Sequence, residues 1–242
     1  MKSIIPNSLT ALNLFCGCLA VLSFLNQFYS LGIILVFVAS IADFFDGFAA
    51  RLLNVQSELG KELDSLADMI SFGFVPGTIL YSAFLKNSNF SSFTELIENQ
   101  YYLPFSGFIL TIFSGLRLAK FNIDKRQSNS FIGLPTPANT LFFLTIPLIW
   151  IYEKDNEFVN NLISNNIILL IFTLFFSYLL IAELPLIALK FKGFSLKDNI
   201  FRYILILLGI VTIITLGNLS IPVILTLYLI ISFIENISRK PA

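Results

Sequence analysis

Long apolar stretches separated by short polar segments run through almost the whole chain. Eight of these stretches approach the roughly 17 to 25 residues that an α-helix needs to cross about 30 Å of hydrocarbon. They lie near 8–26, 31–53, 66–86, 101–121, 137–152, 162–182, 200–217 and 219–236. Only residues 217–219 separate the last two, so seven spans remain an alternative. The pattern predicts an all-α, polytopic membrane bundle of about eight transmembrane helices.

The composition supports a membrane protein. Of the 242 residues, 56% are hydrophobic and 12% are charged, and the mean hydropathy of +0.84 exceeds that of ordinary soluble domains. The 15 basic and 15 acidic residues balance, and no basic run resembles a nucleic-acid surface. We therefore expect membrane lipids, and not nucleic acid, around this chain.

Basic residues fall mainly on one side of the predicted topology. With the N-terminus inside and eight spans, 13 lysines and arginines lie at cytoplasmic ends or loops, and only Lys86 and Lys154 lie outside. Basic residues in short loops stay preferentially in the cytoplasm. The distribution therefore predicts that both termini, and the loop after the second span, are cytoplasmic.

Four acidic residues interrupt the apolar pattern near the cytoplasmic ends of the second and third spans: Asp43, Asp46, Asp64 and Asp68. The first two are spaced i, i+3 and the last two i, i+4, so each pair lies on one stripe of a helix. Small residues accompany both stripes: Gly47 and Ala50 follow the first pair, and Gly60 precedes the second. If the stripes face each other, the carboxylates converge. Like charges near lipid then require a partner.

Divalent cations are one such partner. The chain has no histidine, and hard oxygen ligands favour Mg²⁺, Mn²⁺ or Ca²⁺ over zinc. Four carboxylates suit two such ions, which would attract phosphate oxygens. Salt bridges or the cation pathway of a transporter explain the same spacing equally well at this stage.

Residues 43–68, DFFDGFAARLLNVQSELGKELDSLAD, resemble the signature of the CDP-alcohol phosphatidyltransferase family, D-x2-D-G-x2-A-R-x8-G-x3-D-x3-D, at all eight fixed positions. The resemblance implies an enzyme in which a hydroxyl displaces CMP from a CDP-linked substrate, with divalent ions held by Asp43, Asp46, Asp64 and Asp68. It implies that Asp68 is the general base. It also implies that Asp46, Gly47, Ala50, Arg51 and Gly60 bind the CDP group.

Other stretches extend the resemblance. The pattern P-N-x2-T, shared across the family, implies that Asn7 and Thr10 lie near the nucleotide, although a polar helix cap is an alternative. The stretches IIPNSLTALNLFCG and RLAKFN with FIGLPTPAN resemble family members whose acceptor is L-serine. Together with the signature, the resemblance covers most of the first 140 residues.

Serine carries a carboxylate, so its pocket should contain a cationic donor. Arg117 and Lys120, spaced i, i+3 at the cytoplasmic end of the fourth span, fit this requirement, and Asn122 and Arg126 are further candidates. Each basic residue could instead be a snorkelling interface charge. Glycerol 3-phosphate would also attract cations, so charge alone leaves that acceptor open.

We therefore expect one membrane domain over residues 1–242, with its signature at 43–68 and additional spans at about 162–236. The implied reaction is transfer of a phosphatidyl group from CDP-diacylglycerol to L-serine, by direct and metal-assisted attack of the serine hydroxyl. Two Mg²⁺ or Mn²⁺ ions are expected, with Ca²⁺ as another ion that binds. The family also implies a homodimer, and we expect a bacterial cytoplasmic (inner) membrane with the active site facing the cytoplasm.

Three other functions stay open from the sequence. A transferase of the same family could use glycerol 3-phosphate or inositol as its acceptor. More remotely, the acids could line a membrane transporter or ion pathway, or the chain could be a catalytically silent scaffold.

Overall fold

The computed structural model describes residues 3–88, 90–124, 131–187 and 196–238, without the side chains of Phe131 and residues 196–198. The α-helices are α1 (Ile4–Leu25), α2 (Tyr29–Leu52), α3 (Glu58–Asp68), α4 (Val75–Lys86), α5 (Phe93–Glu98), α6 (Phe108–Ile123), α7 (Thr136–Phe143), α8 (Thr145–Tyr152), α9 (Glu157–Ser164), α10 (Asn166–Ile181), α11 (Leu196–Leu216) and α12 (Ser220–Ser238). A π-helical turn, η1 (Met69–Phe74), joins α3 to α4. Two 3₁₀ turns, η2 (Leu103–Gly107) and η4 (Gly217–Leu219), precede α6 and α12.

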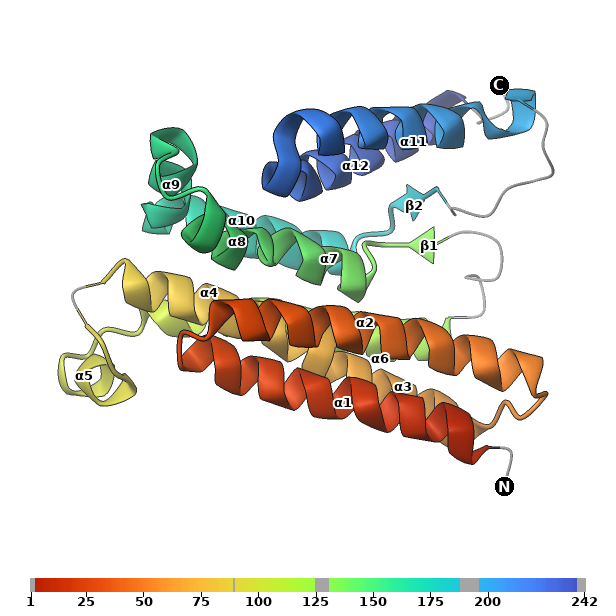
Figure 1. Cartoon of the computed structure of the whole chain (residues 1–242), viewed down its shortest axis with the longest axis horizontal. Coiled ribbons are helices and arrows are strands. Elements are labelled where there is room, and N and C mark those ends of the chain that lie inside the picture. The colour runs from red at the N-terminus through yellow and green to blue at the C-terminus, as the bar shows by residue number, and fades with distance from the viewer. Residues whose placement is uncertain (1–2, 89, 125–130, 188–195, 239–242) are drawn as a thin grey trace.

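The long helices run side by side in three layers (Figure 1). Helices α1 to α4 and α6 form the first layer, α7, α8 and α10 form the second, and the hairpin of α11 and α12 forms the third. Large side chains that are almost fully buried, such as Phe24, Phe84 and Phe143, belong to one hydrophobic core that includes residues of the first two layers. Apolar side chains also cover the outside, including Ile34 and Phe175, each at least half exposed. Helices that are apolar on all sides are expected where lipid is the solvent.

The predicted all-α membrane fold is confirmed, whereas the count of eight spans is not. Among the described residues, four helical segments are long and apolar enough to cross a membrane: Ile4–Leu25, Tyr29–Leu52, Glu58–Lys86 and Asn199–Ser238. A fifth is possible if α9 and α10 act as one span, although the chain bends by 73° between them. The Asn165 side chain accepts hydrogen bonds from the N–H groups of Ile167 and Ile168 at this bend, which starts α10 in a new direction.

The remaining predicted spans are shorter than the pattern suggests. Helix α6 has 16 residues, and α7 and α8 are two pieces of 8 residues each. Residues 199–238 form one long apolar helical segment, and the chain turns within this segment at Gly217, where φ is +52°. Helices α11 and α12 pack against each other on either side of this turn (Figure 1).

The third span begins earlier than expected, and this change positions the acids. A continuous helical segment runs from Glu58 to Lys86, so Asp64 and Asp68 lie within it. Helix α2 ends before Asn54, whose positive φ of 52° suits the left-handed turn after a helix. The Ser57 hydroxyl then caps α3 by accepting a hydrogen bond from the Gly60 N–H at 3.0 Å. Only residues 53–57 therefore connect the two acidic helices.

A short non-helical layer lies between the second and third layers. Strand β1 (Phe131–Ile132) pairs antiparallel with β2 (Pro185–Leu186). Gly133 follows β1 with φ of +79°, and a Cβ there would lie 2.8 Å from the Leu180 carbonyl oxygen. Ile187, which follows β2, bonds to α12 through both backbone groups. Its N–H donates to Ser232 Oγ, and its carbonyl accepts from Tyr228 Oη. Irregular backbone inside a membrane protein needs such internal partners.

Candidate active site

Three of the four predicted acids converge. One carboxylate oxygen each from Asp43 on α2 and from Asp64 and Asp68 on α3 lies within 4.8 Å of the other two. All three side chains are partly buried, so their charges are only partly screened by water. The helical spacing and the short connection predicted this convergence, and the structure confirms it.

The fourth acid, Asp46, is held slightly apart from this cluster. It is 5% exposed, and its Oδ2 accepts a hydrogen bond from Thr10 Oγ1 on α1 at 2.6 Å. Hydrogen bonds to an ionised carboxylate are stronger than neutral ones. Thr10 therefore fixes the orientation of Asp46 beside the other three acids.

The acids have no basic partner among the described residues. No lysine or arginine of this part of the chain forms an ion pair with any of the four. In addition, Asp64 Oδ1 is buried and has no hydrogen-bond partner in the described structure. Buried polar atoms are almost always satisfied, and three carboxylates at this spacing present the hard oxygens that Mg²⁺, Mn²⁺ and Ca²⁺ prefer. The residues present therefore fit a divalent cation.

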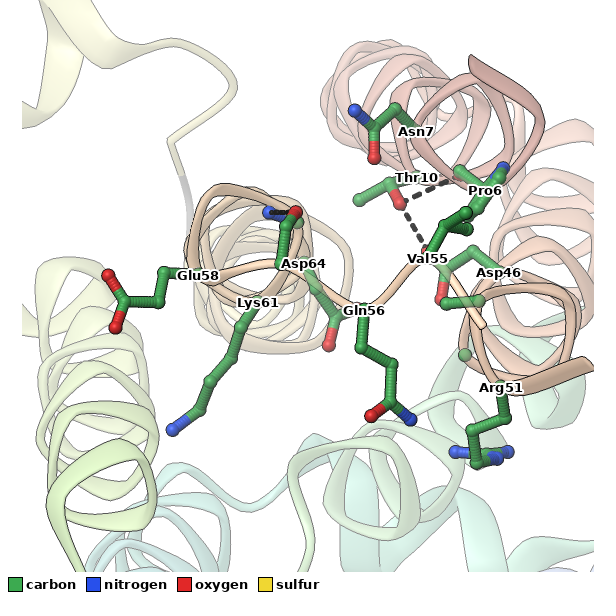
Figure 2. Close-up of a pocket in the computed structure, with 14 residues that line it drawn as sticks. Pro6, Asn7, Thr10, Asp46, Arg51, Val55, Gln56, Glu58, Lys61 and Asp64 are labelled. Atoms are coloured by element: carbon green, nitrogen blue, oxygen red, sulfur yellow. Dashed lines mark hydrogen bonds between the residues drawn. The ribbon is translucent and has the colours of Figure 1, made fainter. Parts of the chain in front are cut away.

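A cavity of about 460 Å³ opens beside the acids. The seven residues predicted to bind the CDP group all line it: Asn7, Thr10, Asp46, Gly47, Ala50, Arg51 and Gly60. Asp64 lines it as well, so the cavity reaches the acidic cluster. Figure 2 shows Thr10 and Asp46 directed at each other, while Arg51 and Lys61 extend from α2 and α3 toward the same side of the view. Acids and bases thus share one polar opening in an otherwise apolar bundle.

Small residues shape two walls of this cavity. A Cβ added at Gly60 would lie 3.2 Å from Ser57 Oγ and 3.7 Å from Asn7 Oδ1, so Gly60 lets α1 approach the start of α3. A Cβ at Gly47 would lie 3.5 Å from Nη1 of Arg51. A larger side chain at either position would narrow the cavity or displace a polar group that lines it.

Arg117 and Lys120, two of the residues predicted to bind serine, contact partners outside the cavity. Arg117 is 5% exposed, and its Nε donates a hydrogen bond to the Leu134 carbonyl at 3.2 Å. Lys120 forms an ion pair with Glu183 at 3.4 Å. The structure does not bring Arg117 and Lys120 into the 460 Å³ cavity.

Asn122 and Arg126 are the other two residues predicted to bind serine. Asn122 Nδ2 donates to Ser65 Oγ at 2.9 Å, and the Asn122 carbonyl accepts from Lys61 Nζ at 2.9 Å. These bonds tie the end of α6 to α3, next to the cavity that Lys61 lines. Arg126 lies outside the described residues. The role of all four candidates in serine binding stays a prediction.

Two site residues were missed by sequence reasoning. Asn13 is fully buried and its Nδ2 donates to Asp68 Oδ1 at 3.2 Å. Lys61 lines the cavity between Gly60 and Asp64. The spacing of Asn7, Thr10 and Asn13 was an available signal, because residues at i, i+3 and i+6 follow one face of a helix.

Comparisons with known proteins agree with this site. Residues 3–187 match the family model described as CDP-alcohol phosphatidyltransferase. The chain is 39% identical to a CDP-diacylglycerol–serine O-phosphatidyltransferase of Bacillus subtilis over 137 residues, which are 55% of this chain and 69% of that protein. It is 31% identical to the protein of that name from Helicobacter pylori (strain 26695) over 234 residues, 95% of this chain and 90% of the relative. A third, from Methanocaldococcus jannaschii, is 37% identical over 140 residues, 58% of each chain.

The family match and the site occupy the same part of the molecule. The matched region includes α1 to α3, which carry the acids and line the cavity, and it ends at Ile187. Helices α11 and α12 lie beyond it. The Helicobacter relative nevertheless aligns with 95% of the chain, so its similarity extends past the family match.

Proposed function

The chain belongs to the CDP-alcohol phosphatidyltransferase family, and on this premise we propose that it transfers a phosphatidyl group from CDP-diacylglycerol to L-serine and releases CMP. One observation supports this most strongly: a cluster of acids without basic partners among the described residues adjoins a cavity lined by all seven residues expected to bind CDP. The acceptor follows from the three relatives, whose printed names all specify serine.

We propose that Asp43, Asp46, Asp64 and Asp68 hold two divalent cations, Mg²⁺ or Mn²⁺, and that Ca²⁺ can also bind. The convergent oxygens and the unpartnered Asp64 Oδ1 support this assignment. When bound, such cations neutralise the diphosphate charge that grows as CMP leaves. Thr10 keeps Asp46 in place through its 2.6 Å hydrogen bond.

The nucleotide end of the donor would occupy the 460 Å³ cavity. Arg51 extends over Gly47, and a guanidinium can donate two parallel hydrogen bonds to phosphate oxygens. Gly60 leaves room for the nucleotide beside the capped start of α3. Asn7 and Thr10 from α1 line the same cavity.

Asp68 would act as the general base. Asn13 holds its Oδ1, which leaves Oδ2 to accept the proton from the serine hydroxyl as that oxygen attacks phosphorus. A bond forms between the serine oxygen and the phosphatidyl phosphorus, and the bond from that phosphorus to the CMP oxygen breaks. The displacement is direct, because the chain has no histidine to form a phosphatidyl-enzyme intermediate.

Among the four serine candidates, Arg117 has the strongest support. It is a buried cation at 5% exposure, and it forms no ion pair within the described part of the chain. Lys120 would have to leave Glu183 to contact the substrate, and the Asn122 side chain already bonds to Ser65. We retain Lys120, Asn122 and Arg126 as further proposed contacts for the serine carboxylate.

The protein is an integral membrane protein, and we propose that its site faces the cytoplasm of a bacterium from the cytoplasmic (inner) membrane. The two lysines predicted to lie outside are Lys86, the last residue of α4, and Lys154, which follows α8. In Figure 1 the end of α4 and the end of α8 lie at the same end of the bundle. Lys86 Nζ lies 4.3 Å from the ring centroid of Trp150, and tryptophan is common at membrane interfaces. We further propose that residues 1–242 act as one domain and that the chain forms a homodimer.

An acceptor screen tests the proposed function. Purified protein would receive CDP-diacylglycerol, Mn²⁺ or Mg²⁺, and one of L-serine, glycerol 3-phosphate or inositol, and CMP release would be measured. Serine alone should stimulate release. Stimulation by another acceptor would assign a different reaction within the family. Metal-dependent ion flux without any CMP would support a transporter instead.

A further inference from the structure

The two polar atoms of the buried Asn13 side chain have different surroundings. Its side chain is 0% exposed, its Nδ2 donates to Asp68 Oδ1 at 3.2 Å, and its Oδ1 has no hydrogen-bond partner among the described residues. The backbone is fixed as well, because the Asn13 carbonyl accepts from Ser71 Oγ at 3.0 Å. One turn further along α1, a Cβ at Gly17 would overlap Ser71, so α1 and η1 are in close contact at this point.

The orientation of this amide follows from chemistry. An ionised carboxylate only accepts hydrogen bonds, so the NH₂ group of Asn13 must face Asp68 and Oδ1 must point away from it. A buried acceptor without a donor is destabilising, because it has given up its hydrogen bonds to water and gained none in return. A fully buried side chain that carries this cost beside the proposed base suggests that its donor arrives with the substrate.

We propose that Asn13 determines specificity by accepting a hydrogen bond from the serine ammonium through Oδ1. This inference rests on the proposed function. Serine carries its ammonium on the carbon next to the one that bears the hydroxyl, and Asn13 carries its two polar atoms on one carbon. In the proposed complex, a serine hydroxyl at Asp68 and a serine ammonium at Asn13 Oδ1 would match these two spacings.

This arrangement also separates serine from the other acceptors of the family. Glycerol 3-phosphate and inositol carry a hydroxyl on the corresponding carbon and lack a positive charge there. Their hydroxyl can also donate a hydrogen bond to Oδ1, but a hydrogen bond from an ionised donor is roughly twice as strong as one from a neutral donor, so the site favours the serine ammonium. The Asn13 oxygen thus complements the cation Arg117 as a contact for the other charged group of serine.

The test compares serine with 3-hydroxypropanoate, which has the same hydroxyl and carboxylate but no ammonium. The measured quantity is the ratio of kcat/KM for the two acceptors, in wild type and in Asn13→Leu. Leucine is similar in shape to asparagine and has no polar atom. We expect the preference for serine to fall about tenfold or more, mainly through a higher KM for serine.

Two further variants make the test specific. Asn13→Asp keeps an acceptor oxygen for the ammonium but adds a negative charge beside Asp68, so kcat should fall while the preference for serine persists. Asn26→Leu removes an amide from the exposed end of α1, where Asn26 bonds only to its own helix at Leu22, and should change neither quantity. The inference is overturned if Asn13→Leu and Asn13→Asp change the acceptor ratio by the same factor, or if Asn13→Leu leaves it unchanged.

A binding measurement applies even if the leucine variant is inactive. Serine should raise the unfolding temperature of the wild-type protein with CMP and Mn²⁺ present, and this shift should disappear in Asn13→Leu, while the shift caused by Mn²⁺ alone remains. Loss of the Mn²⁺ shift would make Asn13 a metal ligand and overturn the inference. If serine does not stimulate CMP release by the wild-type protein, the proposed function itself fails, whatever the Asn13 variants do.

Discussion

Two groups of charged side chains lie among the apolar helices, and they differ in what balances their charge. In the C-terminal hairpin, Arg202 and Glu235 form an ion pair at 3.6 Å, with side chains 6% and 9% exposed. In the N-terminal helices, Asp43, Asp64 and Asp68 place like charges within 4.8 Å of each other. The first group neutralises itself within the protein. We propose that a divalent cation completes the second, which would distinguish a functional site from a structural pair.

The comparison has opposite consequences for stability and activity. Removing one partner of a buried ion pair leaves an isolated charge and typically costs about 3–5 kcal/mol. Removing one of several like charges relieves repulsion instead, so the metal-free protein should gain stability as it loses function. Substitutions in the two groups should therefore change different measured quantities.

The largest expected effect is loss of activity on removal of the base. Asp68→Asn removes the proton acceptor and one metal oxygen, so CMP release with serine should fall by about 10²–10⁴-fold or more. The unfolding temperature in the presence of a chelator should not fall, because repulsion decreases. If Asp68→Asn keeps its activity, Asp68 is not the base. If Asp68→Asn unfolds more easily than wild type without metal, removal of one acid does not relieve repulsion in the cluster.

Breaking the ion pair should mainly destabilise the protein. Glu235→Gln leaves Arg202 charged and buried, which should lower the free energy of unfolding by about 3–5 kcal/mol. Activity per folded molecule should stay close to that of wild type. The double variant Arg202→Met with Glu235→Leu should recover much of the stability, as measured by denaturant unfolding in detergent. A large fall in kcat for folded Glu235→Gln would instead place the hairpin in the catalytic machinery.

A smaller effect is expected from the hydrogen bond that orients Asp46. Thr10→Val removes the 2.6 Å bond from its hydroxyl, and hydrogen bonds to charged groups contribute about 1.5–3 kcal/mol. We expect roughly a tenfold loss in kcat/KM for CDP-diacylglycerol. Thr78→Val is a matched control, since that hydroxyl is also buried but bonds only to its own helix at Phe74. Equal losses in both variants would argue against a role for Thr10 at the site.

The smallest effect should come from the exposed ion pair. Lys120 and Glu183 lie 3.4 Å apart with side chains 41% and 63% exposed, and such pairs contribute about 0–1 kcal/mol. Glu183→Gln should therefore change the free energy of unfolding by less than about 1 kcal/mol. A loss as large as that of Glu235→Gln would mean that burial does not distinguish the two pairs.

Much of the site could be predicted from the sequence because it depends on local spacing. Helical periodicity and a short connection are enough to bring Asp43, Asp64 and Asp68 together, and all seven expected CDP-binding residues line one cavity. The predicted serine contacts are less local. Arg117 bonds to Leu134 and Lys120 to Glu183, and these partners depend on how α6 packs against segments far along the chain.

Features that depend on packing between distant segments could not be predicted. Asn13 meets Asp68 across 55 positions in the sequence, and the shared helix face of Asn7, Thr10 and Asn13 does not by itself identify Asp68 as the partner. The count of eight spans is not confirmed for a related reason, because hydropathy marks apolar length but not the 73° bend between α9 and α10.

The most direct test of the central claim is the binding of Mn²⁺ to purified protein, followed by its paramagnetic resonance signal. Wild type should bind Mn²⁺ saturably, Mg²⁺ should displace it, and the double variant Asp43→Asn with Asp64→Asn should lose this binding while Glu235→Gln retains it. The account is contradicted if wild type binds no more Mn²⁺ than that double variant, even with CDP-diacylglycerol present.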